Sequence, residues 1–180
     1  METLLEFRNL TEVLQNLTNA IKRDYQGYLS SHGKDASGAL SRSAESGRVI
    51  RVNAGRFEIV FNLMDYYYYV ERGAMGAESS PAGALGKVHW PPPQAIADWI
   101  TIKPVIPRPD SRGRIPTPQQ LTFLIGRKIH NKGIEPTPAM TTAVGSNVPK
   151  YQKAIEEAIL KDVSGYVDVI VNQAFSGFTA

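Results

Sequence analysis

Two long amphipathic segments, one near each end of the chain, constrain the fold more than any other feature of the sequence. From Thr3 to about Ser31, and again from Pro149 to about Phe175, apolar residues recur every three or four positions. This spacing places them on one side of an α-helix, with polar residues on the other side. The apolar positions include Leu10, Val13, Leu14, Leu17, Ile21, Tyr25, Tyr28 and Leu29 in the first segment and Tyr151, Ala154, Ile155, Ala158, Ile159, Val163, Tyr166, Val167, Ile170 and Val171 in the second. We therefore expect long N- and C-terminal amphipathic helices.

The region between these helices predicts a small antiparallel sheet. Residues 48–53 and 56–62 carry alternating or continuous apolar side chains and flank Asn53-Ala54-Gly55. A short turn with a glycine between two such runs is typical of a β-hairpin. Residues 32–47 are small and polar and indicate a loop, with a short turn at Ala39-Leu40. The expected fold class is α+β, with a small antiparallel β-sheet packed against the long terminal helices, and long projecting loops.

Three further segments predict shorter helices. Residues 65–72 favour a helix over a strand because Gly73 follows them, and glycine commonly ends helices. Pro91-Pro92-Pro93 can begin a second helix, since proline is tolerated in a first turn. Thr117-Pro118-Gln119-Gln120 has the residues and spacing of a capping box, which opens a third helix that ends at Gly133.

Two stretches rich in proline, glycine and small residues are expected to form loop arms, at about 73–91 and 103–116. Loops longer than ~12–15 residues without their own secondary structure tend to be functional or disordered. The second arm is also basic. It carries Pro104, Pro107, Pro109, Pro116, Arg108, Arg112 and Arg114. Because we find neither an internal repeat nor an inter-domain linker, we expect residues 1–180 to form a single domain.

Composition excludes several classes of protein. The chain has no cysteine, so a disulfide framework, a thiolate zinc site and a cysteine nucleophile are all excluded. Such a chain fits folding in a reducing cytoplasm. No secretory signal is expected at the start, and no apolar run approaches the ~20 residues that cross a bilayer, so we expect a soluble protein without a membrane partner. The net charge of +3 is too small to indicate a dedicated DNA-binding domain.

The sequence offers little support for an enzyme. His32, His89 and His130 lie far apart, and none has an acidic or histidine partner at metal-ligand spacing. Pro109-Asp110 has the first residues of a nuclease signature, but no strand-borne Glu-x-Lys follows. The glycines of the first arm match neither a phosphate-binding loop nor a dinucleotide fingerprint. We therefore predict no catalytic residue, no metal site and no cofactor.

Nucleic-acid binding is the stronger alternative. Basic residues end the helix that begins near Pro118, and three arginines precede it; the set is Arg108, Arg112, Arg114, Arg127, Lys128 and Lys132. Cations in the last turn of a helix also interact favourably with the helix dipole, which accounts for Arg127 and Lys128 without any ligand. Pro136 and Pro138 obstruct a recognition helix after Gly133, so sequence-specific reading of DNA is not expected. Non-specific phosphate contacts remain open, as do contacts with an acidic partner.

Several stretches together resemble a family of phage proteins. A long N-terminal helix (residues 4–31) leads to the small-residue segment 36–43 and a hairpin at 48–62. Asp65-Tyr66-Tyr67-Tyr68-Tyr69-Val70-Glu71-Arg72-Gly73 is similar to that family's short aromatic helix with a Val-Glu-aromatic-Gly end. Residues 125–138 (Ile-Gly-Arg-Lys-Ile-His-Asn-Lys-Gly-Ile-Glu-Pro-Thr-Pro) are similar to its basic helix end, glycine and proline-flanked turn. The family is the tail-completion or neck (head-tail connector) proteins of tailed bacteriophages, of the minor tail component type.

Two departures accompany this resemblance. Arg72 stands where the family usually has an aromatic residue, and Ala139-Met140 stand where an aromatic commonly follows the turn. The resemblance implies a structural virion protein, made in the host bacterial cytoplasm, that forms a six-fold or twelve-fold homo-oligomeric ring at the head-tail junction through which DNA passes. It also implies contacts with portal or connector proteins or with tail-tube proteins, and it carries over no catalytic residue. The alternative function is a DNA-binding accessory protein.

Apolar residues in and near the loop arms are the expected subunit interface. Exposed apolar segments usually mark interfaces, and amphipathic aromatic residues are favoured there. The candidate interface residues are Tyr66, Tyr67, Tyr68, Tyr69, Trp90, Ile102, Val105 and Ile106. Repetition of one heterologous contact closes a ring, so we expect the arms to reach adjacent subunits.

Overall fold

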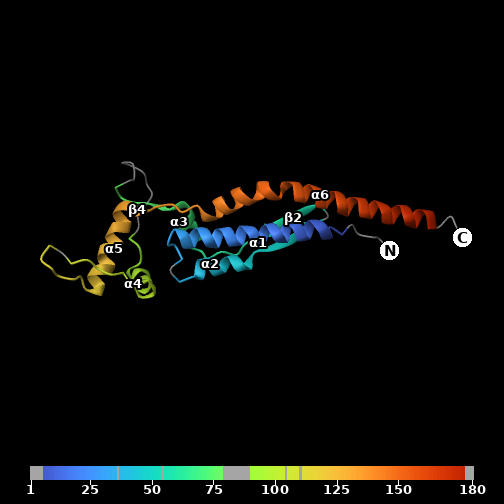
Figure 1. The fold of residues 1–180 in the computed structure, drawn as a ribbon. Coiled ribbons are helices and arrows are strands. Elements are labelled where there is room, and N and C mark those ends of the chain that lie inside the picture. Colours follow the sequence, from blue (N-terminus) through green and yellow to red (C-terminus); the bar gives the residue numbers. More distant parts are fainter. Residues whose placement is uncertain are drawn as a thin grey trace. The chain divides into compact units, whose positions relative to one another are not determined.

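The computed structural model of the chain has the expected α+β class, with long helices near both termini (Figure 1). It describes residues 6–35, 37–53, 55–78, 90–103, 105–109 and 111–176, with side chains as far as residue 172. The chain divides into two compact units. The first is built from Met1–Tyr28, Ser43–Leu63 and Met140–Ala180, and the second from Leu29–Arg42 and Met64–Ala139. That the whole chain acts as one domain stays a prediction.

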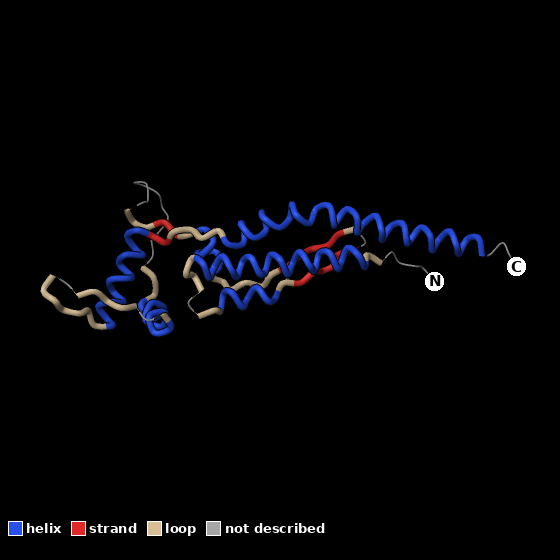
Figure 2. Tube along the Cα trace, viewed as in Figure 1, coloured by secondary structure: helices blue, strands red, loops and turns tan. Residues whose placement is uncertain are grey.

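In the first unit, helices α1 (Arg8–Ser31) and α6 (Ala139–Ser176) run antiparallel. Asp162 of α6 bonds to Asn9 near the start of α1, and Asn147 bonds to Asp24 nearer its end. The hairpin of β1 (Arg48–Asn53) and β2 (Arg56–Val60) lies beside α1 (Figure 2). Phe57 of β2 meets Phe7 edge-on, with ring centroids 5.5 Å apart. The predicted hairpin is thus confirmed, although β2 ends at Val60 instead of Asn62.

The core of the first unit lies along the predicted apolar face of α1. Its buried side chains are Leu10, Leu17, Thr18, Ala20, Ile21 and Tyr25 of α1, Ala44, and Ala143 and Ala158 of α6. Gly47, just before β1, has no room for a side chain. A Cβ at this position would overlap the ring of Phe61 and lie in tight contact with the Thr18 methyl group.

Asp162 joins the two helices through the first turn of α1. Its Oδ1 accepts hydrogen bonds from the Asn9 backbone N–H (3.0 Å) and from Asn9 Nδ2 (2.7 Å), and its Oδ2 accepts one from the Leu10 N–H (2.9 Å). These N–H groups belong to the first turn, where a helix offers donors without intrahelical acceptors, and its dipole favours a negative charge. The Asp162 carboxylate, 153 residues from Asn9 in the sequence, therefore caps the N-terminus of α1.

The predicted bounds of both long helices need correction. Helix α1 begins at Arg8, so Glu6 and Phe7 precede it, and residues 3–5 of the predicted helix lie outside the described part. Helix α6 begins at Ala139, ten residues before the predicted start at Pro149, which lies inside the helix.

Burial explains why α6 continues through a proline. Ala139, Ala143 and Asn147 recur every four residues and are all buried. Asn147 Nδ2 donates to Ala143 O (2.8 Å) and to Asp24 Oδ2 (2.7 Å), so the buried amide is satisfied. An internal proline costs a helix about 3 kcal/mol, and we attribute the compensation to this buried, hydrogen-bonded face.

In its described residues, the second unit contains four short helices, the last turn of α1 and a two-residue strand pair. The helices are α2 (Ala39–Ser43, whose last residue belongs to the first unit), α3 (Tyr67–Arg72), α4 (Pro93–Ile102) and α5 (Pro118–Lys132), and the strands are β3 (Ala74–Met75) and β4 (Gly133–Ile134). Helices α3, α4 and α5 confirm the three predicted short helices. The capping box is also present, with Thr117 Oγ1 accepting from Gln120 N (3.3 Å) and Gln120 Oε1 from Thr117 N (2.9 Å).

The strand pair β3–β4 was not expected, because residues 73–91 were predicted as a loop. It depends on a close crossing of two backbones at Gly73 and Gly133, which have positive φ angles of 72° and 80°. A Cβ at Gly133 would overlap the carbonyl oxygen of Ala74, and one at Gly73 would overlap that of Ile134. The rest of the first predicted arm, residues 79–89, lies outside the described part of the chain.

Among the described residues, no helix is both long enough and apolar enough to cross a lipid bilayer.

The bond between Asp162 and α1 predicts an acid-sensitive first unit. Burial raises the pKa of the Asp162 carboxyl, but the hydrogen bonds from Leu10 and Asn9 outweigh it, so the pKa lies below its ordinary value of 3.8. The folded state therefore gains stability above the ordinary pKa and loses it as the pH falls through the lower, folded-state value. Asp162→Asn should cost about 2 kcal/mol of unfolding free energy at pH 7, measured by urea denaturation.

Asp168→Asn is the matched control, because Asp168 is an exposed aspartate on the same helix. It should change stability by less than about 0.5 kcal/mol. Equal effects of the two variants would contradict the role given to Asp162.

Candidate functional site

Several exposed apolar residues of the second unit lie on α5 and on the segments before it. Phe123 and Leu124 lie on α5, Ile115 lies just before it, and Ile106 lies in the 103–116 arm, where its side chain is 90% exposed. Trp90 and Trp99 are also exposed. Large apolar patches are uncommon on monomeric proteins and usually mark interaction sites, so the surface of α5 is the candidate site.

Trp90 is held on α5 by ring stacking. Its indole lies between the rings of Phe123 (centroids 5.8 Å apart, planes at 20°) and His130 (4.8 Å, 9°), which are seven residues apart on one face of the helix. Gly126 lies beneath it, since a Cβ there would lie 3.5 Å from Trp90 Cζ3 and 3.3 Å from Ile96 Cδ1. Trp90, a predicted interface residue, therefore also has a structural role within its own unit.

Two hollows flank Phe123 and form what we call the α5 groove. One has a volume of 360 Å³ and is lined by Trp90, Pro91, Pro93, Gln94, Ile96, Ala97, Gln119, Thr122, Phe123 and Gly126. The other has a volume of 610 Å³ and is lined by Arg114, Ile115, Pro116, Gln119, Gln120, Phe123 and Leu124. Because both hollows share Gln119 and Phe123, they adjoin along one face of α5. Most residues that line the two hollows are apolar, which suits an apolar peptide segment.

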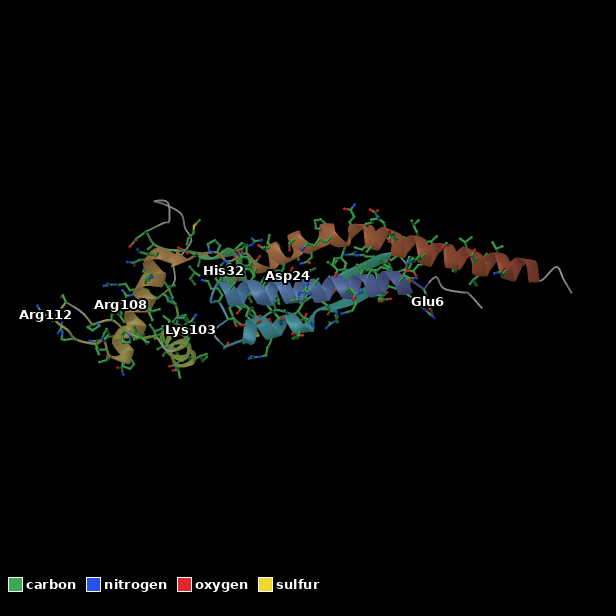
Figure 3. All side chains as sticks on the ribbon, in the orientation of Figure 1. Glu6, Asp24, His32, Lys103, Arg108 and Arg112 are labelled. Atoms are coloured by element: carbon green, nitrogen blue, oxygen red, sulfur yellow. The ribbon has the colours of Figure 1, made fainter. Side chains whose placement is uncertain are left out.

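The predicted basic residues lie on the 103–116 arm and on α5, and one of them, Arg114, lines the groove. Arg108 and Arg112 are exposed on the arm, while Lys103 at its base donates a hydrogen bond to Gly33 O (2.8 Å) (Figure 3). Arg114 lines the groove, and Arg127, Lys128 and Lys132 are exposed on α5. In the sequence from Lys103 to Lys132, Asp110 is the one acidic residue. The arm and α5 together therefore carry an excess of positive charge, which would attract a phosphate backbone or an acidic protein.

The four tyrosines do not join this surface. Tyr68 and Tyr69 are exposed on α3 and meet edge-on, with centroids 6.1 Å apart. Arg72 lies over the Tyr68 ring at 5.0 Å and donates a hydrogen bond to its hydroxyl (3.3 Å). Burial, followed by the nearby Asp35 carboxylate, raises the pKa of Tyr66. None of the tyrosines at positions 66–69 lines the α5 groove, although Tyr68 and Tyr69 remain accessible to a partner.

The remaining predicted interface residues, Ile102 and Val105, do not line the groove. Ile102, the last residue of α4, is exposed, and Val105 is half-buried. Sequence reasoning missed Phe123, Ile115 and Leu124, which carry much of the apolar surface. The sequence does contain a pattern that could have identified this face of the helix, because Phe123, Gly126 and His130 follow a helical spacing of three and four.

The described residues contain no group of three or more histidine, aspartate or glutamate side chains placed to hold a metal ion. His32 interacts with the Ser31 hydroxyl (3.1 Å), and His130 stacks on Trp90. His89 and Asp110 lie outside the described residues. No protein-family model, curated protein or solved structure matches the chain. The function must therefore be argued from the chain's own residues.

Substitution of Gly126 tests the packing of Trp90 against α5. Gly126→Leu should displace the indole, because its side chain would occupy the space of Trp90 and Ile96. Gly126→Ala should be tolerated, since a lone Cβ meets only the movable ends of two side chains and alanine favours the helix by about 1 kcal/mol. Tryptophan fluorescence in a Trp99→Phe background would report on Trp90 alone. A red shift in the leucine variant only is expected, and identical spectra would contradict the stacking.

Proposed function

We propose that this chain is a structural subunit of a homo-oligomeric ring at the head-tail junction of a tailed bacteriophage, through which DNA passes. Its ring would have six-fold or twelve-fold symmetry and would contact portal or connector proteins or tail-tube proteins. The observation that carries the proposal is the α5 groove together with Ile106 on the neighbouring arm, a concave apolar surface beside an exposed apolar projection. A concave and a projecting surface on one subunit suit the heterologous contacts that build rings.

The resemblance to the phage neck family gains support from a contact between its two most distinctive stretches, residues 65–73 and 125–138. The end of the tyrosine helix and the turn after α5 lie against each other, since Thr137 N donates to Val70 O (2.8 Å) and Ala77 N donates to His130 O (2.8 Å). The glycines of both stretches, Gly73 and Gly133, make the crossing sterically possible. Two motifs that resemble the same family therefore form one local structure in this chain.

The proposal is tested by counting this chain against the portal protein in purified virions with quantitative mass spectrometry. A ratio near one is expected for a twelve-fold ring, and near one half for a six-fold ring, on a twelve-fold portal. Absence of the chain from mature particles would refute a structural role.

A single substitution tests the arm. Ile106→Asp should leave thermal unfolding unchanged, because the side chain is 90% exposed. It should reduce the yield of joined particles if Ile106 docks on a neighbouring subunit. Ser111→Asp, which adds the same charge to the same arm, is the control and should assemble normally. If both variants assemble like the unmodified chain, Ile106 is not part of the ring contact.

The second candidate is a DNA-binding accessory protein, which the exposed basic residues of the arm and of α5 favour. It predicts that the purified protein binds duplex DNA and that binding weakens steeply between 50 and 200 mM salt, since each phosphate contact releases counterions. Arg108→Gln and Arg127→Gln should each lower the slope of log K against log[salt] by about one, whereas Lys153→Gln on α6 should not change it. Undetectable binding at 50 mM salt would exclude this candidate.

A further inference from the structure

The rings of His130, Trp90 and Phe123 form a column that runs along α5. Their centroids lie 4.8 Å and 5.8 Å apart, and the planes of neighbouring rings differ by 9° and 20°. His130 and Phe123 are seven residues apart, a distance of about 10.5 Å along a helix axis. The two centroid separations together span this distance, so Trp90 fills the space between the outer rings and leaves Phe123 as one end of the column.

One face of the Phe123 ring stays open among the described residues. Trp90 stacks on its inner face, yet Phe123 is 57% exposed. The larger hollow of the α5 groove, with a volume of 610 Å³, is lined by Phe123 but not by Trp90. This hollow therefore lies on the side of Phe123 that the stack leaves open, and its volume is typical of ligand sites.

The larger hollow combines a flat face with groups that form hydrogen bonds. Gln119, which lines it, precedes Phe123 by about 6 Å along the helix axis and so lies beside the next position in the column. Its carboxamide can both donate and accept hydrogen bonds. A flat ligand ring with polar edges, stacked on Phe123, would therefore meet a complementary group. An aliphatic peptide segment has no such ring, so the column favours an aromatic ligand.

The charge near this hollow favours an anionic ligand. Arg114 lines the hollow, and Arg127 follows Phe123 by four residues, which makes the two side chains neighbours on the helix surface. From Lys103 to Lys132 the chain has seven basic residues and one acidic residue, a net charge of +6, whereas the whole chain carries +3. The other residues therefore carry −3, so the positive charge is concentrated in the segment that forms this hollow.

We propose that the larger hollow binds a single-stranded segment of nucleic acid, with one unpaired base stacked on Phe123. Proteins hold single strands with aromatic rings beside positive charge, because every base has a flat face and every linkage carries a phosphate. Gln119 contacts the edge of the base, and Arg114 and Arg127 contact the phosphates on either side. A duplex does not present this face, since its bases are stacked on one another.

The inference goes beyond the proposed ring and uses a different part of the groove. The smaller hollow, which Trp90 lines, remains for the contact with a neighbouring subunit. The inference also differs from binding of duplex DNA by phosphate contacts alone, because it requires the ring of Phe123.

Probes that differ only in their bases test the stacking. Fluorescence anisotropy of labelled probes at about 50 mM salt would compare the binding of the purified full-length chain to an oligothymidylate of about twelve nucleotides and to the same phosphate backbone without bases. We expect the oligothymidylate to bind at least about tenfold more tightly, since stacking adds to the shared phosphate contacts. Equal affinities would show attraction by phosphates alone and would overturn the proposal, as would undetectable binding of the oligothymidylate.

Substitution of Phe123 assigns the effect to its ring. Phe123→Leu keeps an apolar side chain without a flat face, so it should weaken oligothymidylate binding at least about fivefold and leave binding of the base-free strand and of a duplex unchanged. Phe123→Trp retains a ring and should bind the oligothymidylate within about twofold of the unmodified chain, with circular dichroism confirming that both variants fold. Unchanged oligothymidylate binding by Phe123→Leu, or an equal loss for all three probes, would overturn the proposal.

A free nucleotide offers the same base and phosphate. Thymidine monophosphate should displace the oligothymidylate only at a concentration at least about a hundredfold higher, because it lacks the further phosphates that the arm and α5 would contact together. Displacement at a concentration similar to that of the oligothymidylate would identify a mononucleotide site and overturn the proposal.

The ring and this inference can fail separately. A chain present at ring stoichiometry in virions that binds the base-free strand as tightly as the oligothymidylate would retain the ring and refute the inference. A chain absent from virions whose oligothymidylate binding depends on Phe123 would refute the ring and retain the inference.

Discussion

The first unit depends on a single carboxylate. Asp162 accepts three hydrogen bonds from Asn9 and Leu10 and so satisfies donors in the first turn of α1 that local sequence leaves without a cap. With the bond from Asn147 to Asp24, it fixes the antiparallel register of α1 and α6 at two points. Each bonded pair joins the helices across more than 120 residues of chain. Because these contacts hold α6 over a long span, the helix can tolerate Pro149 and extend beyond its partner.

The second unit depends on the absence of side chains. Gly73 and Gly133 allow two backbones to cross so closely that strands β3 and β4 pair, and Gly126 leaves room for Trp90 between Phe123 and His130. Gly126 is the one of these glycines that lines the α5 groove, whereas Gly73 and Gly133 join the two strands. The local structure of the second unit therefore rests on positions with no side chain as much as on its apolar residues.

Helix α6 holds the first unit together along one side. Tyr151, Ile155, Ala158 and Asp162 recur there at intervals of three and four, and the Tyr151 hydroxyl donates a hydrogen bond to Asn16 O of α1 (3.4 Å). The second unit contributes an apolar groove and the basic arm that carries Ile106. A subunit with separate association surfaces is well suited to a closed assembly.

The sequence alone determined the elements whose signals are local. The amphipathic spacing of α1, the hairpin at residues 48–60 and the capping box at Thr117 were predicted because each depends on residues within a few positions of one another. Only the tertiary structure decided that α1 starts at Arg8, that α6 runs through Pro149, and that Gly73 meets Gly133. Each of these depends on partners 60 to 153 residues away, and their burial or hydrogen bonding outweighs local propensity.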